Sequence, residues 1–277
     1  MDFNSLLHTA EVTAKTDEKK AMIMLESLID KLEETGDRFA AYHSFTESFE
    51  YMIYDYVNQS ETPSRNIAEN FARMYQLYGN LLRNSGLYPE AAEALQKARR
   101  WNPVNGEIGL DCSEAWIAAG EEEKGEALCK EILRMAFKAP DFARGYRLLG
   151  SGFLRRKQYR EAAGCFLLSL DYEPDSPESQ TGLDAVKRSA GSDYKEPAVE
   201  EMLKISGENG FIIGANPDIV NLALAYARQA EENGSVPAAK YLLGILYDLM
   251  QDEHVKTMMD SLEEKPGDIA GEGDGNV

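Results

Sequence analysis

The sequence predicts an all-α chain in which helical hairpins stack side by side as an α-solenoid. Apolar residues recur at helical spacing along most of the 277 residues, and no stretch shows the alternation typical of a strand. One helical stripe carries Gly79 in its interior, where glycine costs about 1 kcal/mol relative to alanine. The following helix offers Ala91 as a matching small residue, which indicates that the two helices cross closely. Because one hairpin cannot bury its apolar face alone, we expect further copies.

The first clear hairpin meets at the turn around Gly86. Its first helix carries one stripe at i, i+3, i+4 and i+7, formed by Tyr75, Tyr78, Gly79 and Leu82. Its second helix carries Ala91, Leu95 and Ala98, and Pro103 ends it.

A second copy repeats these spacings. Tyr146-x2-Leu149-Gly150-x2-Phe153 matches the first helix, and Ala162-x3-Phe166 followed by Pro174 matches the second. Twelve positions separate Gly79 from Ala91, and twelve separate Gly150 from Ala162. An ordinary antiparallel bundle would share the apolar period but not this fixed spacing.

Two weaker copies complete the pattern. Gly109 and Gly125-x3-Cys129 form a middle hairpin whose late proline, Pro140, suggests a second helix about one turn longer. Ala223-x2-Tyr226-Ala227 and Ala239-x3-Leu243 form a late hairpin without the large aromatic residues.

These spacings resemble the tetratricopeptide repeat, W-x2-L-G-x2-Y…A-x3-F…P. The resemblance implies a right-handed α-solenoid and a non-enzymatic role in protein–protein interaction. It also implies that an extended peptide lies in a concave groove lined by the first helices of the repeats.

We expect one elongated unit over residues 1–264, because repeats pack only on their neighbours. Its clear repeats span about 72–105, 106–141 and 143–176, and its degenerate hairpins span 17–60, 177–206 and 218–250. A short helix precedes Asp17, an aromatic-rich helix runs over about 37–57, and Thr62-Pro63 opens the next helix. Phe211-Ile212-Ile213 is expected to plug the array, and the Gly-rich acidic segment 265–277 to be disordered.

The net charge is −19, from 29 basic and 48 acidic residues. This balance disfavours nucleic acid and anionic membrane surfaces, which both require cations on the protein. No long apolar run or secretory leader is visible, and three unpaired-looking cysteines (Cys112, Cys129, Cys165) favour the cytoplasm.

Catalytic constellations are not evident. The three histidines (His8, His43, His254) are scattered, so no metal site, cofactor or nucleophile is predicted. An enzyme or regulator whose active part lies in residues 190–277 remains the third reading.

Arginine is concentrated beside the packing stripe of the first helices, in a chain that is otherwise acidic. Because a guanidinium holds a carboxylate through two hydrogen bonds, these positions predict a groove for an acidic or C-terminal peptide segment. The expected binding residues are Arg73, Gln76, Asn80, Arg83, Arg144, Arg147, Ser151 and Arg155. In the middle repeat, Glu107, Leu110, Glu114 and Ile117 take the corresponding positions.

Two alternatives stay open. The arginines are equally well placed to pair with acidic neighbours such as Glu69, Glu107 and Glu114. The likeness to carboxylate-clamp repeats is partial: Asn80 and Arg144 match, whereas Gln76, Asp111 and Leu148 depart from it. A scaffold that forms a homodimer through its aromatic N-terminal helices, with Tyr51 and Tyr54 in the interface, is the alternative function.

Overall fold

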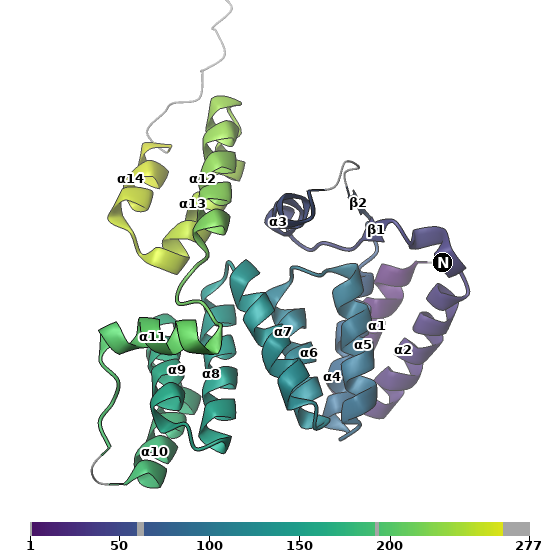
Figure 1. The fold of residues 1–277 in the computed structure, drawn as a ribbon. Coiled ribbons are helices and arrows are strands. Elements are labelled where there is room, and N and C mark those ends of the chain that lie inside the picture. The colour runs from purple at the N-terminus through teal and green to yellow at the C-terminus, as the bar shows by residue number, and fades with distance from the viewer. Residues whose placement is uncertain (1, 60–63, 192–193, 263–277) are drawn as a thin grey trace, which may run out of the picture. The chain divides into compact units, whose positions relative to one another are not determined.

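The computed structural model describes residues 2–59, 64–191 and 194–262, and it shows an all-α array of stacked hairpins. Three central hairpins follow one another along the chain, and the first helix of each contacts the first helix of the next (Figure 1). They are α4 (Phe71–Asn84) with α5 (Tyr88–Trp101), α6 (Gly106–Ala118) with α7 (Glu122–Met135), and α8 (Ala139–Arg155) with α9 (Tyr159–Tyr172).

The glycines inside the first helices sit at close helix crossings, as predicted. A Cβ added to Gly79 would lie 2.6 Å from Leu95 Cγ, and one added to Gly150 would lie 3.1 Å from a ring carbon of Phe166. Gly109 of the middle hairpin meets Ile132 in the same way, at 2.3 Å. The small residue in one helix therefore makes room for a large side chain of its partner helix.

Pro140 has a different role from the predicted one. The second helix of the middle hairpin is no longer than its counterparts, since α5, α7 and α9 each have 14 residues. Pro140 instead lies in the first turn of α8, where its missing N–H leaves no helical bond unmade. The extra turn belongs to α8, which has 17 residues.

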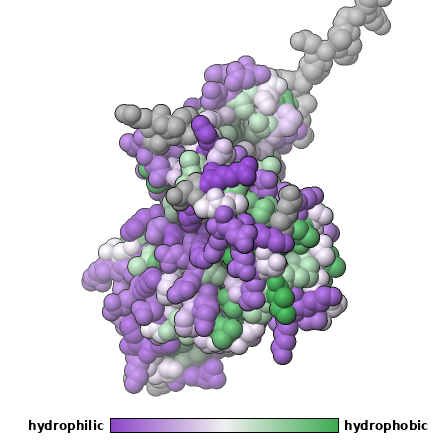
Figure 2. All heavy atoms as spheres, turned by 90° about the vertical axis from the view of Figure 1, so that its right-hand side faces the viewer, coloured by the Kyte–Doolittle hydropathy of each residue, from purple (hydrophilic) through white to green (hydrophobic). Residues whose placement is uncertain are grey.

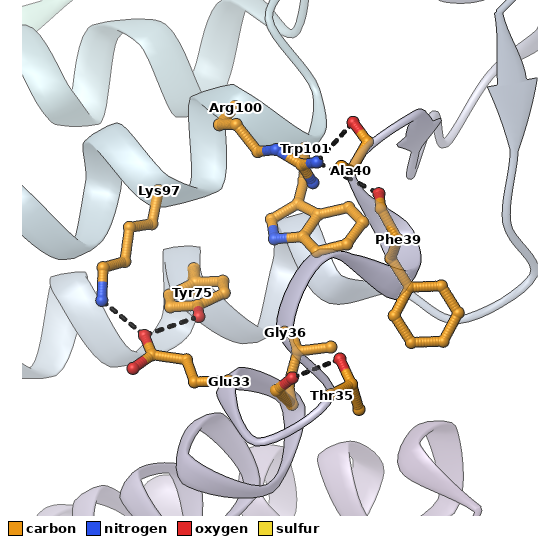
Figure 3. A pocket seen from close by; sticks show the side chains of 10 residues that line it. Glu33, Thr35, Gly36, Phe39, Ala40, Tyr75, Lys97, Arg100 and Trp101 are labelled. Carbon is orange, nitrogen blue, oxygen red and sulfur yellow. Dashed lines mark hydrogen bonds and ion pairs between the residues drawn. The ribbon is translucent and has the colours of Figure 1, made fainter.

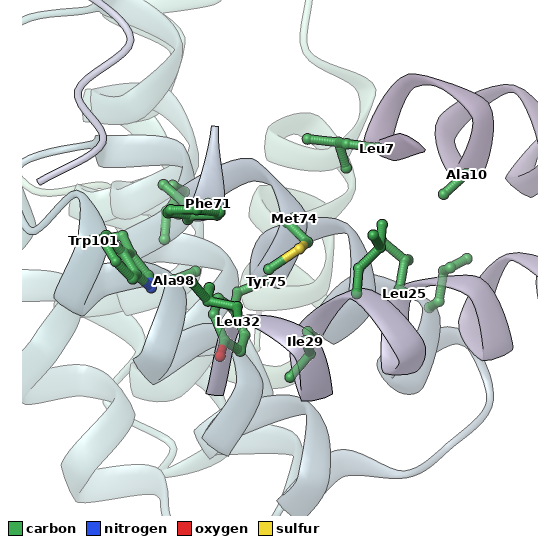
Figure 4. Close-up of a cluster of buried hydrophobic side chains, with 14 of the residues drawn as sticks. Leu7, Ala10, Leu25, Ile29, Leu32, Phe71, Met74, Tyr75, Ala98 and Trp101 are labelled. Atoms are coloured by element: carbon green, nitrogen blue, oxygen red, sulfur yellow. The ribbon is translucent and has the colours of Figure 1, made fainter. Parts of the chain in front are cut away.

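The N-terminal hairpin also differs from the expected range 17–60. It is formed by α1 (Phe3–Ala14) and α2 (Glu18–Glu33), which are capped by the side chains of Asp2 and Asp17. Its apolar side chains join those of α4 and α5 in one buried cluster, shown in Figure 4. The members labelled there are Leu7, Ala10, Leu25, Ile29, Leu32, Phe71, Met74, Tyr75, Ala98 and Trp101.

An insertion, defined here as residues 34–70, separates this hairpin from α4. It contains a 3-10 turn η1 (Gly36–Phe39), a two-residue parallel pair of β1 (Tyr42–His43) and β2 (Arg65–Asn66), and α3 (Ser48–Asn58). The expected long helix over 37–57 is wrong because α3 begins only after Glu47, at a capping box closed by Glu50. Thr62-Pro63 lies outside the described residues.

The insertion is fastened to loops of two successive hairpins. The Ser44 N–H donates to the Trp101 carbonyl at 2.8 Å, and the Phe49 ring packs edge-on against Phe137, with centroids 5.2 Å apart. Glu50 is fully buried, and its carboxylate accepts hydrogen bonds from the side chains of Asn102 at 2.8 Å and Asn105 at 2.7 Å. Elements that are not neighbours in an ordinary repeat array are thereby joined.

Beyond α9, the chain no longer forms hairpins of the same kind. α10 (Pro177–Ala190) packs against α8 and α9, whereas α11 (Val199–Asn209) packs on α9, with Met202 against Gly164. The expected pairing of the two helices within 177–206 is therefore replaced by separate contacts with α9. Phe211 is 4% exposed and packs against Tyr146 and Phe153, so it fills the array as expected.

The described residues divide into two compact units between Asn216 and Pro217. This division differs from the single array expected over residues 1–264. The first unit ends where Tyr146 accepts a hydrogen bond from the Gly214 N–H at 2.9 Å and Asn216 donates to the Arg134 carbonyl at 3.0 Å. The segment 210–216 contacts α7 and α8 but contains no helix, so it adds no further hairpin to the stack.

The second unit contains a hairpin of α12 (Pro217–Glu232) and α13 (Val236–Met250), followed by α14 (Glu253–Ser261). Ala223, Ala227 and Ala239 are buried in it, so small residues again lie at the crossing. The predicted acidic tail, 265–277, lies outside the described residues.

Replacing Gly79 by valine should lower the free energy of unfolding by about 2 kcal/mol, because the added carbons meet Leu95 and the Ala91 carbonyl. Gly207→Ala is the matched control: this helical glycine has no atom within 4 Å of the added Cβ, and the change should stabilise by about 0.5 kcal/mol. Urea unfolding measures both. A neutral Gly79→Val variant would be incompatible with the close crossing.

Candidate functional site

The surface formed by the first helices α4, α6 and α8 is organised around acidic residues of the middle helix. Glu107, Asp111 and Glu114 lie at i, i+4 and i+7 of α6, and therefore on one face. Asp111 is only 3% exposed. A carboxylate at this depth needs hydrogen bonds or cations to offset the loss of its hydration.

Asp111 receives donors from both neighbouring hairpins. On the α4 side, its Oδ2 accepts hydrogen bonds of 2.9 Å from the amide groups of both Gln76 and Asn80. On the α8 side, Arg144 Nη2 donates to its Oδ1 at 2.6 Å. One buried carboxylate thus links the first helices of three successive hairpins.

Glu114 extends this network by one helical turn. Its carboxylate pairs with Arg83 Nη1 at 2.6 Å and with Arg144 Nε at 2.8 Å. Burial of Arg144 disfavours its charge, but the hydrogen bonds and negative charge of Glu114 and Asp111 outweigh burial and raise the pKa of this guanidinium. Asp111, Glu114 and their donors Gln76, Asn80, Arg83 and Arg144 are called the carboxylate network below.

The structure therefore brings four of the eight predicted binding residues together and joins them to acidic residues of the same chain. Arg83 and Arg144 thus form ion pairs within the chain, as the alternative to peptide binding expected. Glu114 takes the expected part in it, and Glu107 accepts a hydrogen bond from Gln76 at 3.0 Å. Glu69 belongs to none of the ion pairs found in the described part of the chain.

The other four predicted residues lie outside the network. Arg73 pairs with Glu11 of α1 at 3.0 Å, and Arg147 pairs with Glu173 at the end of α9. Arg155 pairs with Glu122 at 3.2 Å, and both side chains are more than 40% exposed. Ser151 lines a groove between α8 and α10.

Sequence reasoning missed Asp111 and placed Leu110 on this surface instead. Leu110 is fully buried, and Asp111, one position later, takes the expected place opposite α4 and α8. The acidic spacing of Glu107, Asp111 and Glu114 was a readable signal, because its period is helical and the flanking first helices carry arginines. Glu11 had no such signal, since α1 was not assigned to a hairpin.

Two hollows lie along the first helices. The first, called the insertion pocket, is walled by the insertion, α1, α4, the start of α6 and Lys138. The second, called the α8–α10 groove, is lined by Ser151, Leu154 and Arg155 of α8, by Lys157, and by one face of α10 with Phe166 beneath.

A third hollow, between α2, η1 and α5, is shown in Figure 3. Its polar groups are engaged within the chain: Glu33 accepts from Tyr75 at 3.2 Å and from Lys97 at 2.5 Å. Arg100 donates to the carbonyl groups of Phe39 and Ala40 and lies over the Trp101 ring. This hollow is a junction that fixes the start of the insertion to α5.

The aromatic residues of the insertion pack largely on one another. His43 lies 4.3 Å from Tyr54 between ring centroids, and Phe45 lies 6.0 Å from Tyr51. Tyr56 is the most exposed aromatic side chain of α3, at 44%. Tyr51 and Tyr54 are thus partly used inside the chain.

The three cysteines are buried as free thiols, and burial raises the pKa of Cys112 to about 11. Over residues 2–59, 64–191 and 194–262, no group of three or more His, Cys, Asp or Glu is arranged to hold a metal ion. Nor does this part of the chain contain a helix that is both long and apolar enough to cross a membrane.

Comparison with known families agrees with this geometry. A family model described as tetratricopeptide repeat matches residues 82–150, from the last turn of α4 to Gly150 of α8. The matched segment, residues 82–150, is thus similar to tetratricopeptide repeats. A search of curated proteins found no match to the chain. Tetratricopeptide repeats generally mediate protein–protein interaction and are typically not enzymes.

Asp141 is a buried acid in the first turn of α8. It is 8% exposed and lies against Gly106 at the start of α6. Burial raises its pKa to about 6, Lys138 and Arg144 oppose that rise, and Glu107 and Glu50 add to it.

Because the pKa of Asp141 is higher in the folded than in the unfolded chain, its protonation favours folding, and this contribution is lost as pH rises from about 4 through 6. Asp141→Asn lacks the titrating group, so its stability relative to the parent chain should improve by about 2 kcal/mol between pH 4 and 7. Urea unfolding at both pH values measures the difference. A difference that does not change with pH would contradict the assignment.

Proposed function

We propose that this chain is an interaction module that holds an extended segment of a partner protein along α4, α6, α8 and α10. The observation that carries the proposal is the α8–α10 groove, which combines an apolar floor with two basic residues, Arg155 and Lys157, and one acidic residue, Glu178. Figure 2 shows the hydropathy of another face, seen from the right-hand side of Figure 1. Such a combination suits a peptide, because apolar contacts supply affinity while a few charged groups fix its position.

The floor of the groove comes from Leu154, Phe166 and Ala185. Gly182 of α10 approaches Phe166 so closely that an added Cβ would lie 2.5 Å from the ring. The missing side chain keeps this face of α10 flat, and an apolar side chain of the partner has room between the two first helices.

The rim of the groove carries Arg155 and Lys157. The pair of Arg155 with Glu122 is well exposed, and pairs of this kind contribute only about 0–1 kcal/mol. A carboxylate of the partner therefore exchanges for Glu122 at little cost. Arg83 and Arg144 differ, because moving them would leave Asp111 buried and unpaired.

The acidic-peptide site expected along all the first helices is thus placed at the end of α8. Ser151 and Arg155 line the groove and are assigned to the ligand, whereas Arg147 is held by Glu173. Gln76, Asn80, Arg83 and Arg144 keep the first helices in place. Arg73 is assigned to the insertion pocket, which it lines. The buried thiols support a cytoplasmic location, where cysteines stay reduced.

Self-association through α3 is the second candidate. Tyr56 and the neighbouring Val57, at 44% and 50% exposure, are the residues of α3 that favour it. Static light scattering of the free chain separates the two candidates. A chain that only binds peptides should be a monomer. A dimer that becomes a monomer when Tyr56→Ser and Val57→Ser are combined would support the scaffold.

Screening a displayed library of random 12-residue peptides against the chain tests the groove. Selected peptides should combine an apolar residue with Asp or Glu. Arg155→Glu combined with Lys157→Asp should weaken their binding at least tenfold in fluorescence polarisation, because the rim changes sign. Aspartate suits position 157, where the backbone is left-handed with φ of 60°.

Lys195→Glu combined with Lys204→Glu is the matched control. It makes the same change in net charge outside the groove and should leave affinity within about twofold, by the small effect of distant exposed charges. Equal losses in the two double variants, or a library without selected peptides, would contradict the proposal.

A further inference from the structure

The insertion pocket is a second hollow on the same surface, built in part by the insertion and α1. Its walls bring together Glu11 of α1, Glu47 of the insertion, Arg73 and Gln76 of α4, Glu107 of α6, and Lys138. The lining is mainly polar, in contrast to the apolar floor of the α8–α10 groove.

The cations of this pocket are already matched by acids. Arg73 pairs with Glu11 at 3.0 Å, and Lys138 pairs with Glu47. Glu107 has no cation among these pairs, and its one described hydrogen bond comes from the neutral amide of Gln76 at 3.0 Å. Glu107, in the first turn of α6, is therefore the lining carboxylate without an ion pair among the described residues.

Two further acids lie behind the wall and add to the negative potential. Glu50 is fully buried, and its donors are neutral: the backbone N–H groups of Thr46 and Glu47 and the side chains of Asn102 and Asn105. Asp141 is more than nine-tenths buried, and its carboxylate takes part in no hydrogen bond or ion pair found in the described residues. Burial of Lys138 lowers its pKa, but the hydrogen bond and charge of Glu47, with the charges of Glu50 and Asp141, outweigh burial and raise it.

We propose that the insertion pocket binds the ammonium or guanidinium group of a lysine or arginine side chain presented by a partner protein. A cation here faces Glu107 directly and the field of Glu50 and Asp141 through a wall of low polarisability, where charges interact more strongly than in water. The net charge of −19 also favours the approach of a basic segment.

The pocket gives the bound segment a direction. Its basic residue lies beside the insertion, and its acidic residue lies at the α8–α10 groove. This direction rests on the proposed function, whereas the cation site itself does not, because a short basic peptide tests it without the groove.

Titration of the ¹⁵N-labelled chain with an N-acetylated, C-amidated tetralysine peptide, followed by ¹H–¹⁵N correlation spectra, tests the site. The side-chain amide signals of Gln76 and Asn105, which line the pocket, should shift in a saturable manner. The corresponding tetraglutamate peptide should leave them unchanged. Glu107→Gln should weaken the lysine peptide at least fivefold, and it keeps an acceptor for Gln76.

Glu123→Gln is the matched control, since it removes one exposed carboxylate of α7 outside the pocket and should leave the affinity unchanged. Shifts spread evenly over the acidic surface, equal responses to the two peptides, or an unchanged affinity in Glu107→Gln would each overturn the site. If the tetralysine peptide shifts these amide signals but no acidic peptide binds in the α8–α10 groove, the proposed function is contradicted and the cation site is not.

Discussion

The buried carboxylate of Asp111 is the constraint on which the first-helix surface depends. Repeat hairpins contact only their neighbours, so their relative orientation rests on a few contacts at each junction. Here a single carboxylate accepts from Gln76 and Asn80 on one side and from Arg144 on the other. Its charge in a dry site makes any separation of α4, α6 and α8 costly. The same constraint explains why arginines on this surface are not equally available to a ligand.

The insertion adds a second restraint at the loops that join successive hairpins. Glu50 binds Asn102 and Asn105 in the α5–α6 loop, and Phe49 packs on Phe137 before α8. The carboxylate network and the insertion together determine which charged side chains of the first-helix surface lack a buried partner. Positive charge remains exchangeable at Arg155, and negative charge remains at Glu107. These charges are the reason why we propose recognition at the two ends of the surface, while the carboxylate network holds its centre together.

Much of the fold was predictable, because the helical period and the Gly79-to-Ala91 spacing report directly on helix crossings. The insertion was not, since its aromatic residues follow a helical period while the capping box of Glu47 and Glu50 delays the start of α3. The arginines of the site were found, and Glu114 was named among their partners, but Asp111 was not. Pairing depends on which helix faces meet, and tertiary packing decides that Asp111, not Leu110, faces the neighbouring first helices.

The most direct measurement is the unfolding free energy of Asp111→Ala, followed in urea by the fluorescence of Trp101 and Trp116, which both lie in the first unit. Glu131→Ala is the comparison, since it breaks an ion pair with Arg99 in which Glu131 is 54% exposed. We expect the free energy of unfolding to fall by about 3 kcal/mol in Asp111→Ala, and by less than about 1 kcal/mol in Glu131→Ala. Equal, small losses in both variants would contradict a buried carboxylate that joins three hairpins.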